Sequence, residues 1–214
     1  IFIKNLGGQL SLIKATSTGK FANIDISNLF NIEVGEILAS GQDVKLKSVS
    51  GSIYAAADYK DKTNITASKL DLEAFGSAIL KTMVNKARVS GEDVQLQNNG
   101  TIYIETESLN GSNYSIVADD IVVLDSDQQE IELKSGSNFS LIAEKGNIVF
   151  LDQNETYKVE NGNINFTAKT GGDDSTYNGG IIAANLIITG NGNINLEADK
   201  NITINKIDAG ATGK

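Results

Sequence analysis

The chain of 214 residues contains no histidine, cysteine, proline or tryptophan, and Arg88 is its only arginine. Without histidine it lacks the usual general base and the commonest metal ligand of proteins. Without cysteine it lacks disulfides, thiolate metal sites and thiol nucleophiles. Any chemistry must come from carboxylates, lysine, tyrosine, hydroxyl groups and amides. We therefore expect no catalytic residue, no cofactor and no metal site.

Aromatic residues and positive charge are also scarce. Only 6% of the residues are aromatic although 40% are hydrophobic, so the core must be mainly aliphatic. The chain has 27 acidic and 18 basic residues, which leaves a net charge of -9. A chain this acidic, without a basic patch, is not expected to bind nucleic acid. No apolar run approaches the roughly 20 residues that span a bilayer, so we expect no membrane insertion of this segment.

The first residues, from Ile1 onward, have the pattern of a strand and lack the charged and apolar regions of a signal peptide. An absence of cysteine is common among very large exported proteins, in which stray disulfides would trap the chain. We therefore expect residues 1–214 to be a single elongated domain. It would be a fragment of a larger exported protein, whose other domains are among its partners.

One short pattern recurs through the chain: a glycine, a polar residue, and then alternating apolar and polar positions. A longer echo relates residues 40–46 to residues 90–96, and each copy is followed by Gly-x-Ile-Tyr, at 51–54 and 100–103. A local pattern repeated in this way predicts stacked structural units, and the echo indicates two equivalent turns derived from one block. The short pattern begins at Gly8, Gly51, Gly100, Gly146, Gly162 and Gly192.

Alternation with a period of two predicts short β-strands with one buried and one exposed face. The β-sandwich and the propeller would use Asn-Gly pairs as hairpin turns. The pairs at Asn99, Asn161 and Asn191 instead stand at the head of a strand pattern, as expected for the corners of a solenoid. We therefore predict an all-β fold, a parallel β-helix (β-solenoid) with roughly 20 to 25 residues per rung. Residues 70–86 have partly helical spacing and are expected to form a short helix or an irregular coil.

Two adjacent acid pairs are the only candidates for catalytic machinery, Asp119-Asp120 and Asp173-Asp174. Neighbouring residues of a strand point to opposite faces, so only one acid of each pair can enter a given groove. The second pair lies in the turn-rich residues 171–180, where solvated carboxylates are usual. We therefore predict no catalysis, and we treat Asp173, Asp174 and Tyr177 as a candidate contact region on a protruding loop.

Other polar patterns have structural explanations. Asp125 begins an Asp-Ser-Asp run that resembles an oxygen-ligand loop, but the glycine and terminal glutamate of an EF-hand are missing. The Asn-x-Ser/Thr sequons are explained by asparagine at a corner followed by β-branched residues. The tyrosines would either form a stacking platform for carbohydrate or lie scattered on the rung faces, and we favour the second. The sequons begin at Asn64, Asn113, Asn138, Asn154, Asn165 and Asn201.

Residues 70–79, 89–102 and 190–198 resemble the repetitive shaft of filamentous-haemagglutinin-like exoproteins, which are exported by two-partner secretion. Residues 177–185 are similar to the Gly-Gly-Ala-Ile repeats of chlamydial autotransporter passengers. The resemblance implies a right-handed β-helix, export to the bacterial outer surface, and a role in adhesion or in projecting a tip domain. The secretion domain of that family carries Asn-Pro motifs, and this chain has no proline. The resemblance is therefore to the shaft.

We expect an extracellular structural and adhesive module that presents a surface to a receptor or glycan of a host or neighbouring cell. Two alternatives stay open. One is a carbohydrate-active β-helix enzyme, which needs two carboxylates within about 5 to 10 Å of each other in one cleft. The other is a fibre shaft in which the chain forms a trimer.

Overall fold

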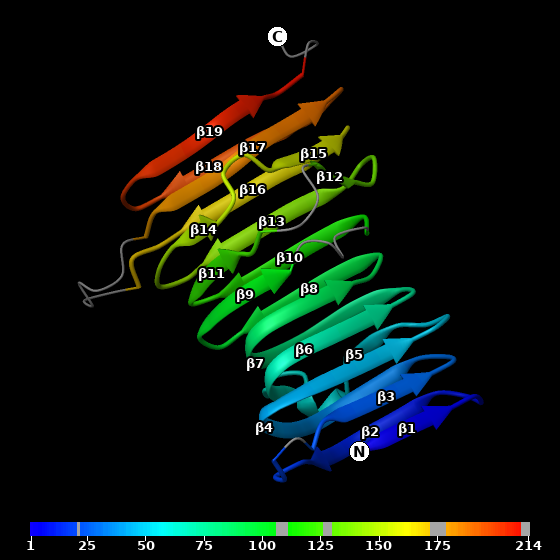
Figure 1. Ribbon diagram of the computed structural model, residues 1–214. Coiled ribbons are helices and arrows are strands. Elements are labelled where there is room, and N and C mark those ends of the chain that lie inside the picture. Colours follow the sequence, from blue (N-terminus) through cyan, green and yellow to red (C-terminus); the bar gives the residue numbers. More distant parts are fainter. Residues whose placement is uncertain (21, 106–110, 126–129, 172–178, 211–214) are drawn as a thin grey trace.

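The computed structural model describes residues 1–20, 22–105, 111–125, 130–171 and 179–210. Over these residues the protein is all-β, and the one helical element is a 3₁₀ turn, η1 (Ala57–Tyr59). The strands follow one another from the N-terminus at one end of the molecule to the C-terminus at the other (Figure 1). They are β1 (Phe2–Asn5), β2 (Leu10–Thr16), β3 (Ile24–Asn28), β4 (Ile32–Ser48), β5 (Ile53–Ala55), β6 (Ile65–Ala74), β7 (Ser77–Ser90), β8 (Asp93–Asn98), β9 (Thr101–Glu105), β10 (Asn113–Ala118), β11 (Asp120–Val123), β12 (Glu130–Leu133), β13 (Asn138–Ala143), β14 (Ile148–Phe150), β15 (Thr156–Glu160), β16 (Asn163–Ala168), β17 (Ile181–Thr189), β18 (Asn193–Ala198) and β19 (Ile202–Asp208).

Every strand pairing within the described ranges is parallel. Partners are distant in the sequence: β10 pairs with β8 on one side and with β13 on the other. The strands that flank the Asn-Gly pairs at Asn99, Asn161 and Asn191 bond to other strands and not to each other. These three pairs therefore do not form hairpin turns between paired strands.

The pairings arrange the strands in three stacks. The first stack runs through β2, β4, β5, β7, β8, β10, β13, β16 and β18. The second runs through β1, β3, β4, β6, β7, β9, β11, β14, β17 and β19. The third joins β12, β15, β17 and β19 in the C-terminal part. The long strands β4 and β7, of 17 and 14 residues, belong to more than one stack because their backbones continue through a corner.

Buried side chains form continuous columns across the strands of a stack. In the first stack Ile53, Ala78, Val94, Tyr114 and Phe139 occupy one register position in consecutive strands, and all five are buried. Successive residues of a strand point to opposite faces, so the alternating sequence places one set inward and the other outward. Each fully buried aliphatic side chain contributes about 1.5–3 kcal/mol. Stability is therefore spread along the whole stack.

Four aromatic rings pack together in the C-terminal part of the core. Phe139, Phe150, Tyr157 and Phe166 are each at most 1% exposed. Phe139 lies edge-on to Phe166, with ring centroids 5.3 Å apart, and is stacked with Tyr157 at 5.9 Å. Phe150 lies 5.0 Å from Tyr157 and 5.4 Å from Phe166. The prediction for the tyrosines was therefore wrong for Tyr157 and for Tyr114, because both rings lie in the core.

Several glycines mark corners at which two backbones nearly touch. A Cβ on Gly111 would lie 1.7 Å from the carbonyl oxygen of Gly91, and one on Gly192 would lie 1.7 Å from that of Gly162. No side chain fits at these distances. Close approach therefore explains the pattern glycines at 51, 146, 162 and 192. At Gly8 and Gly100 no atom lies within 4 Å, and there the positive φ, +65° and +94°, explains the preference for glycine.

Buried asparagines bond to backbone groups at other corners. The amide of Asn98 accepts a hydrogen bond from the Val84 N–H at 2.9 Å and donates one to the Val84 carbonyl at 3.2 Å. It thus takes the place of a strand partner. Asn64 is completely buried, donates to the Gly35 carbonyl at 3.2 Å and accepts from the Lys81 N–H at 2.9 Å. The first sequon therefore has a structural role.

Residues 70–86 form neither a helix nor an irregular coil, so both expectations for this window were wrong. They lie in β6 and β7 and in the short turn between them. Leu72 and Leu80 are buried with strand alternation, whereas Phe75 and Met83, which contributed the helical spacing, are 69% and 47% exposed. The apparent periodicity came from combining core residues with surface residues.

The two copies of the longer echo occupy different stacks. Val44, in the first copy, pairs with Ile24 and Leu70 in the second stack. Val94, in the other copy, pairs with Ala78 and Tyr114 in the first stack. The expectation of two equivalent turns was therefore wrong. The sequences match because both segments are strands with the same inward and outward alternation.

Candidate functional site

The predicted contact region, Asp173, Asp174 and Tyr177, lies outside the described residues, and its role stays a prediction. The chain just before it is tied to the corner after β18. The carboxylate of Asp199 accepts hydrogen bonds from the amide of Thr170 at 2.8 Å and from its hydroxyl at 3.1 Å. These bonds, the backbone one first, lower the pKa of Asp199. Thr170 is thus held by the charged carboxylate of Asp199.

The other acid pair has structural partners. Asp119 forms an ion pair with Lys145 at 3.0 Å, and Asp120 accepts a hydrogen bond from the Asn147 N–H at 2.7 Å. Both contacts connect the start of β11 to the corner before β14. Asp125 is exposed and is the last residue of the described range 111–125. In the part of the chain that the structure describes, no group of three or more acidic side chains is arranged to hold a metal ion.

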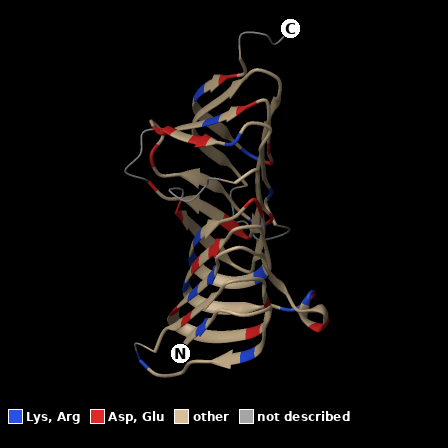
Figure 2. Ribbon diagram, turned by 90° about the vertical axis from the view of Figure 1, so that its right-hand side faces the viewer, with Lys and Arg blue, Asp and Glu red and all other residues tan. Residues whose placement is uncertain are grey.

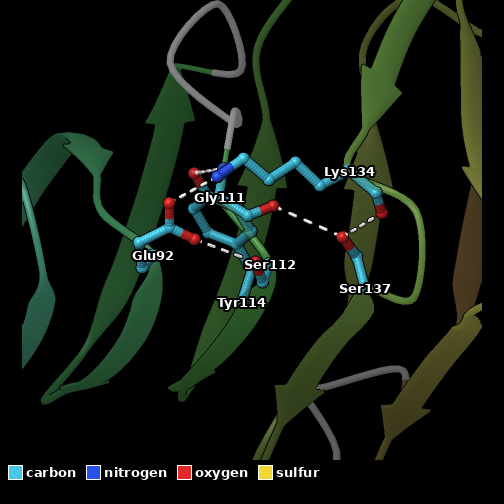
Figure 3. Close-up of polar contacts among 6 residues, drawn as sticks. All are labelled: Glu92, Gly111, Ser112, Tyr114, Lys134 and Ser137. Carbon is cyan, nitrogen blue, oxygen red and sulfur yellow. Dashed lines mark hydrogen bonds and ion pairs between the residues drawn. The ribbon is translucent and has the colours of Figure 1, made fainter.

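A polar cluster joins three corners on one side of the first stack (Figure 3). The carboxylate of Glu92 accepts a hydrogen bond from the hydroxyl of Ser112 at 2.9 Å and forms an ion pair with the ammonium group of Lys134. The hydrogen bond from Lys134, followed by that from Ser112, lowers the pKa of Glu92. The carboxylate therefore stays charged at neutral pH and holds the Ser112 hydroxyl as a donor. This geometry does not activate Ser112 as a nucleophile, because the carboxylate that accepts its hydrogen bond has a lowered pKa and is a weak base.

The same cluster fixes the backbone from which β10 and β13 begin. The N–H of Gly111 donates to the hydroxyl oxygen of Tyr114 at 2.9 Å. The hydroxyl of Ser137 is 3.3 Å from the carbonyl of Gly111 and also bonds the carbonyl of Lys134. These contacts connect consecutive corners, and we interpret the cluster as structural.

The outward face of the first stack carries columns of amide side chains. Asn113, Asn138, Asn163 and Asn193 are in register in β10, β13, β16 and β18. The side-chain amides of the last three each donate a hydrogen bond to the side-chain oxygen of the asparagine before them, at 3.0, 2.7 and 3.4 Å. Such ladders form when like residues stack at the strand spacing. We call this surface the amide face; its remaining members are Gln95, Gln97, Asn165 and Asn195.

A groove opens at the N-terminal end of the amide face and has a volume of about 720 Å³. Its floor contains the column Tyr54, Ile79 and Gln95, which are in register in β5, β7 and β8. A second column contains Lys81 and Gln97, also in register. Ile79 is 39% exposed although it is apolar. The groove therefore combines an apolar strip with amide and ammonium groups.

The sequence prediction missed this groove. The Gly-x-Ile-Tyr pattern did place Tyr54 on the outward side of a strand, opposite to the buried Ile53. Ile79 gave no such signal, because an isolated apolar residue in an alternating segment is normally assigned to the core. The second Gly-x-Ile-Tyr places Tyr103 outward as well, 42% exposed, but in the second stack and away from the groove.

Comparisons with protein-family models, with curated proteins and with solved structures find no match to this chain. Among the residues that the structure describes, there is also no helix with the length and apolar character needed to cross a membrane.

Proposed function

We propose that the chain is a right-handed parallel β-helix that serves as a structural and adhesive segment of a large exported bacterial surface protein. The observation that carries the proposal is the parallel, in-register pairing of nine strands in the first stack, from β2 to β18. Stacked in this way, strands make a rigid rod whose lateral faces repeat at about 4.8 Å. The proposal includes no reaction, cofactor or metal, and it places the segment outside the cell, joined to other domains of the same chain.

The proposed binding surface is the groove on the amide face, and the proposed ligand is a neutral glycan on another cell. Amide side chains both donate and accept hydrogen bonds, as sugar hydroxyl groups require. Ile79, which is 39% exposed, and the partly exposed Tyr54 supply the apolar contact that the C–H face of a sugar ring needs. The groove volume of about 720 Å³ lies within the usual range of ligand sites. The ammonium group of Lys81 is paired with the carboxylate of Asp61 at 3.7 Å, and the charges of Lys60 and Glu144 offset each other. The groove is therefore nearly neutral, which supports a neutral ligand rather than a sulfated one.

The test is the binding of the purified chain to an array of neutral and charged glycans, followed by calorimetric titration of the best ligand. Tyr54→Ala and Gln97→Ala should each weaken binding about tenfold, the equivalent of about 1.4 kcal/mol. Tyr103→Ala is the matched control, because Tyr103 is an outward tyrosine on another stack. Failure to bind any glycan, or equal loss in the control, would overturn the adhesive assignment of the groove.

The rod itself is tested separately by small-angle X-ray scattering. We expect a single elongated particle at low protein concentration. A compact, nearly spherical particle would contradict the β-helix and, with it, the structural role.

A further inference from the structure

The outward face of the second stack carries charges that alternate in sign from strand to strand. Asp25, Lys45, Asp71, Arg88 and Glu105 are in register in β3, β4, β6, β7 and β9. We call this column the charge ladder. Figure 2 shows the alternation of blue and red on successive strands in the N-terminal half of the molecule. Within the chain, the Lys45 ammonium and the Asp71 carboxylate lie 3.8 Å apart, a partly exposed pair of small energetic value.

Two neighbouring columns repeat the opposition of charge between β4 and β6. Asp43 of β4 is in register with Lys69 of β6, and Lys47 of β4 is in register with Glu73 of β6. Lys47 also forms an ion pair with Glu73. The two strands therefore present rows of opposite pattern. In chain order, the three charged side chains of the β4 row are negative, positive and positive, and those of the β6 row are positive, negative and negative.

Apolar residues border these rows at the corner that follows each strand. Asn5, Asn28, Ser48 and Ala74 are in register. The residue after each of them is apolar, and of these four only Leu29 is partly buried. Phe75 and Leu6 are both 69% exposed, and Val49 is 49% exposed. A contiguous exposed apolar strip on a soluble surface usually marks an interaction site. We call it the apolar ridge, and it consists of Leu6, Leu29, Val49 and Phe75.

We propose that this face binds a second copy of the chain in an antiparallel, two-fold arrangement. A two-fold axis along the strand direction, midway between β4 and β6, lays β4 of each copy over β6 of the other. Each column then meets itself with the strand order reversed. Lys45 faces the Asp71 of the second copy, Lys47 faces its Glu73, and Val49 faces its Phe75. Each contact occurs twice, as an isologous interface requires.

The charges favour another copy of this chain over an unrelated partner. The chain as a whole carries -9 and repels its copies, but this patch contains three lysines and three acids and is neutral. If the two-fold axis lay on β4 or on β6, that strand would face its own copy and like charges would lie opposite each other. The charges therefore favour a single register between the two copies. The patch covers only a few strands at about 4.8 Å spacing, so the contact is of the weak, transient class.

This pairing is independent of the proposed glycan site, because the groove lies on the first stack and stays open. Lateral pairing of two rods would present two grooves in one particle. Loss of pairing would therefore leave the affinity of a single groove unchanged, and loss of glycan binding would leave the pairing intact.

The decisive experiment uses two charge-reversed variants of the full chain and sedimentation equilibrium. The first variant carries Lys45→Asp and Lys47→Glu, which makes the β4 row wholly acidic. The second carries Asp71→Lys and Glu73→Lys, which makes the β6 row wholly basic. Each variant alone places like charges across the two-fold axis and should associate at least tenfold more weakly than the unchanged chain.

An equimolar mixture of the two variants should recover the association, because each row then faces its opposite. The contacts within each chain are broken in both variants and are not restored by mixing. Recovery on mixing therefore reports only on contact between chains. A mixture as monomeric as its components would overturn the proposal, as would an unchanged chain that sediments as a monomer up to about 1 mM.

The apolar ridge provides a second test that does not disturb the charges. Phe75→Ser should weaken association about tenfold. The substitution should leave the fold intact, because the Phe75 side chain is 69% exposed. Leu151→Ser is the matched control, since Leu151 is 56% exposed after β14, far from the patch. Circular dichroism spectra verify that both variants fold. Equal effects of the two substitutions would contradict the assigned position of the interface.

Discussion

Replacement of Phe166 by alanine tests the column packing of the core. Phe166 of β16 is in register between Leu141 of β13 and Leu196 of β18. Its ring is 1% exposed and lies 5.3 Å from that of Phe139 and 5.4 Å from that of Phe150. The substitution removes the ring and leaves a cavity between the neighbouring strands.

The expected loss follows from burial and from ring contacts. A buried phenylalanine replaced by alanine costs about 3–5 kcal/mol, and each aromatic pair contributes about 0.5–1.5 kcal/mol of the total. For a chain of this size the loss corresponds to a fall in Tm of roughly 6 to 20 °C. Leu196→Ala is the internal comparison, because Leu196 holds the same register position but is only half-buried. Its loss should be about 1 kcal/mol.

The measurement is urea unfolding followed by far-UV circular dichroism, together with a thermal scan of each variant. Leu141→Ala, fully buried in the same column, should cost about 2–5 kcal/mol. A loss below about 1 kcal/mol for Phe166→Ala, or equal losses for Phe166 and Leu196, would refute the reasoning that each strand buries the column of the one before it.

Three further results are expected. Burial raises the pKa of Glu105, but hydrogen bonds from Lys86 and Lys69 outweigh this effect and lower the pKa overall. The ordinary pKa of a glutamate is 4.5, and above that pH the charged carboxylate stabilises the folded state. This stabilisation is lost as the pH falls through the lowered pKa of the folded state. Glu105→Gln should therefore flatten the acid limb of a stability curve measured by urea unfolding, and an unchanged limb would exclude this linkage. Asn98→Ala should cost about 2–4 kcal/mol, because it leaves the backbone groups of Val84 without their partner; hydrogen exchange at the Val84 amide should accelerate, and full protection would show that the amide has another partner. Gly111→Ala should destabilise by about 3 kcal/mol or more, because its Cβ would collide with a carbonyl oxygen, whereas Gly7→Ala, with no atom within 4 Å, should be nearly neutral in thermal melts.

Part of the fold was predictable because it depends on local geometry. The alternation in segments such as 163–168 places Ile164, Phe166 and Ala168 inward in any strand. It was also predictable that three of the Asn-Gly pairs do not join paired strands, because each of the three stands directly before a strand pattern. The helical spacing in residues 70–86 misled, since nothing local distinguishes the exposed Phe75 from a core residue.

The candidate site was less predictable. The region assigned to Asp173, Asp174 and Tyr177 lies outside the described residues. The groove and the two-fold patch depend on register between strands far apart in the chain, as for Tyr54 with Ile79 and Lys45 with Asp71. Register depends on the lengths of the corners between strands, which the alternation within a strand does not specify.

By itself the sequence determined that the protein is all-β and that each strand has an inward and an outward face, but it did not assign every side chain to the correct face, as the buried Tyr157 and the exposed Ile79 show. These properties follow from the period of two that the strand backbone imposes on every segment. Only the tertiary structure decided which strands are neighbours, and hence that Phe166 meets Phe139 in the core and that rows of opposite charge lie side by side on the surface. Neighbours are selected by long-range packing and backbone hydrogen bonding, which are properties of the assembled chain and of no single segment.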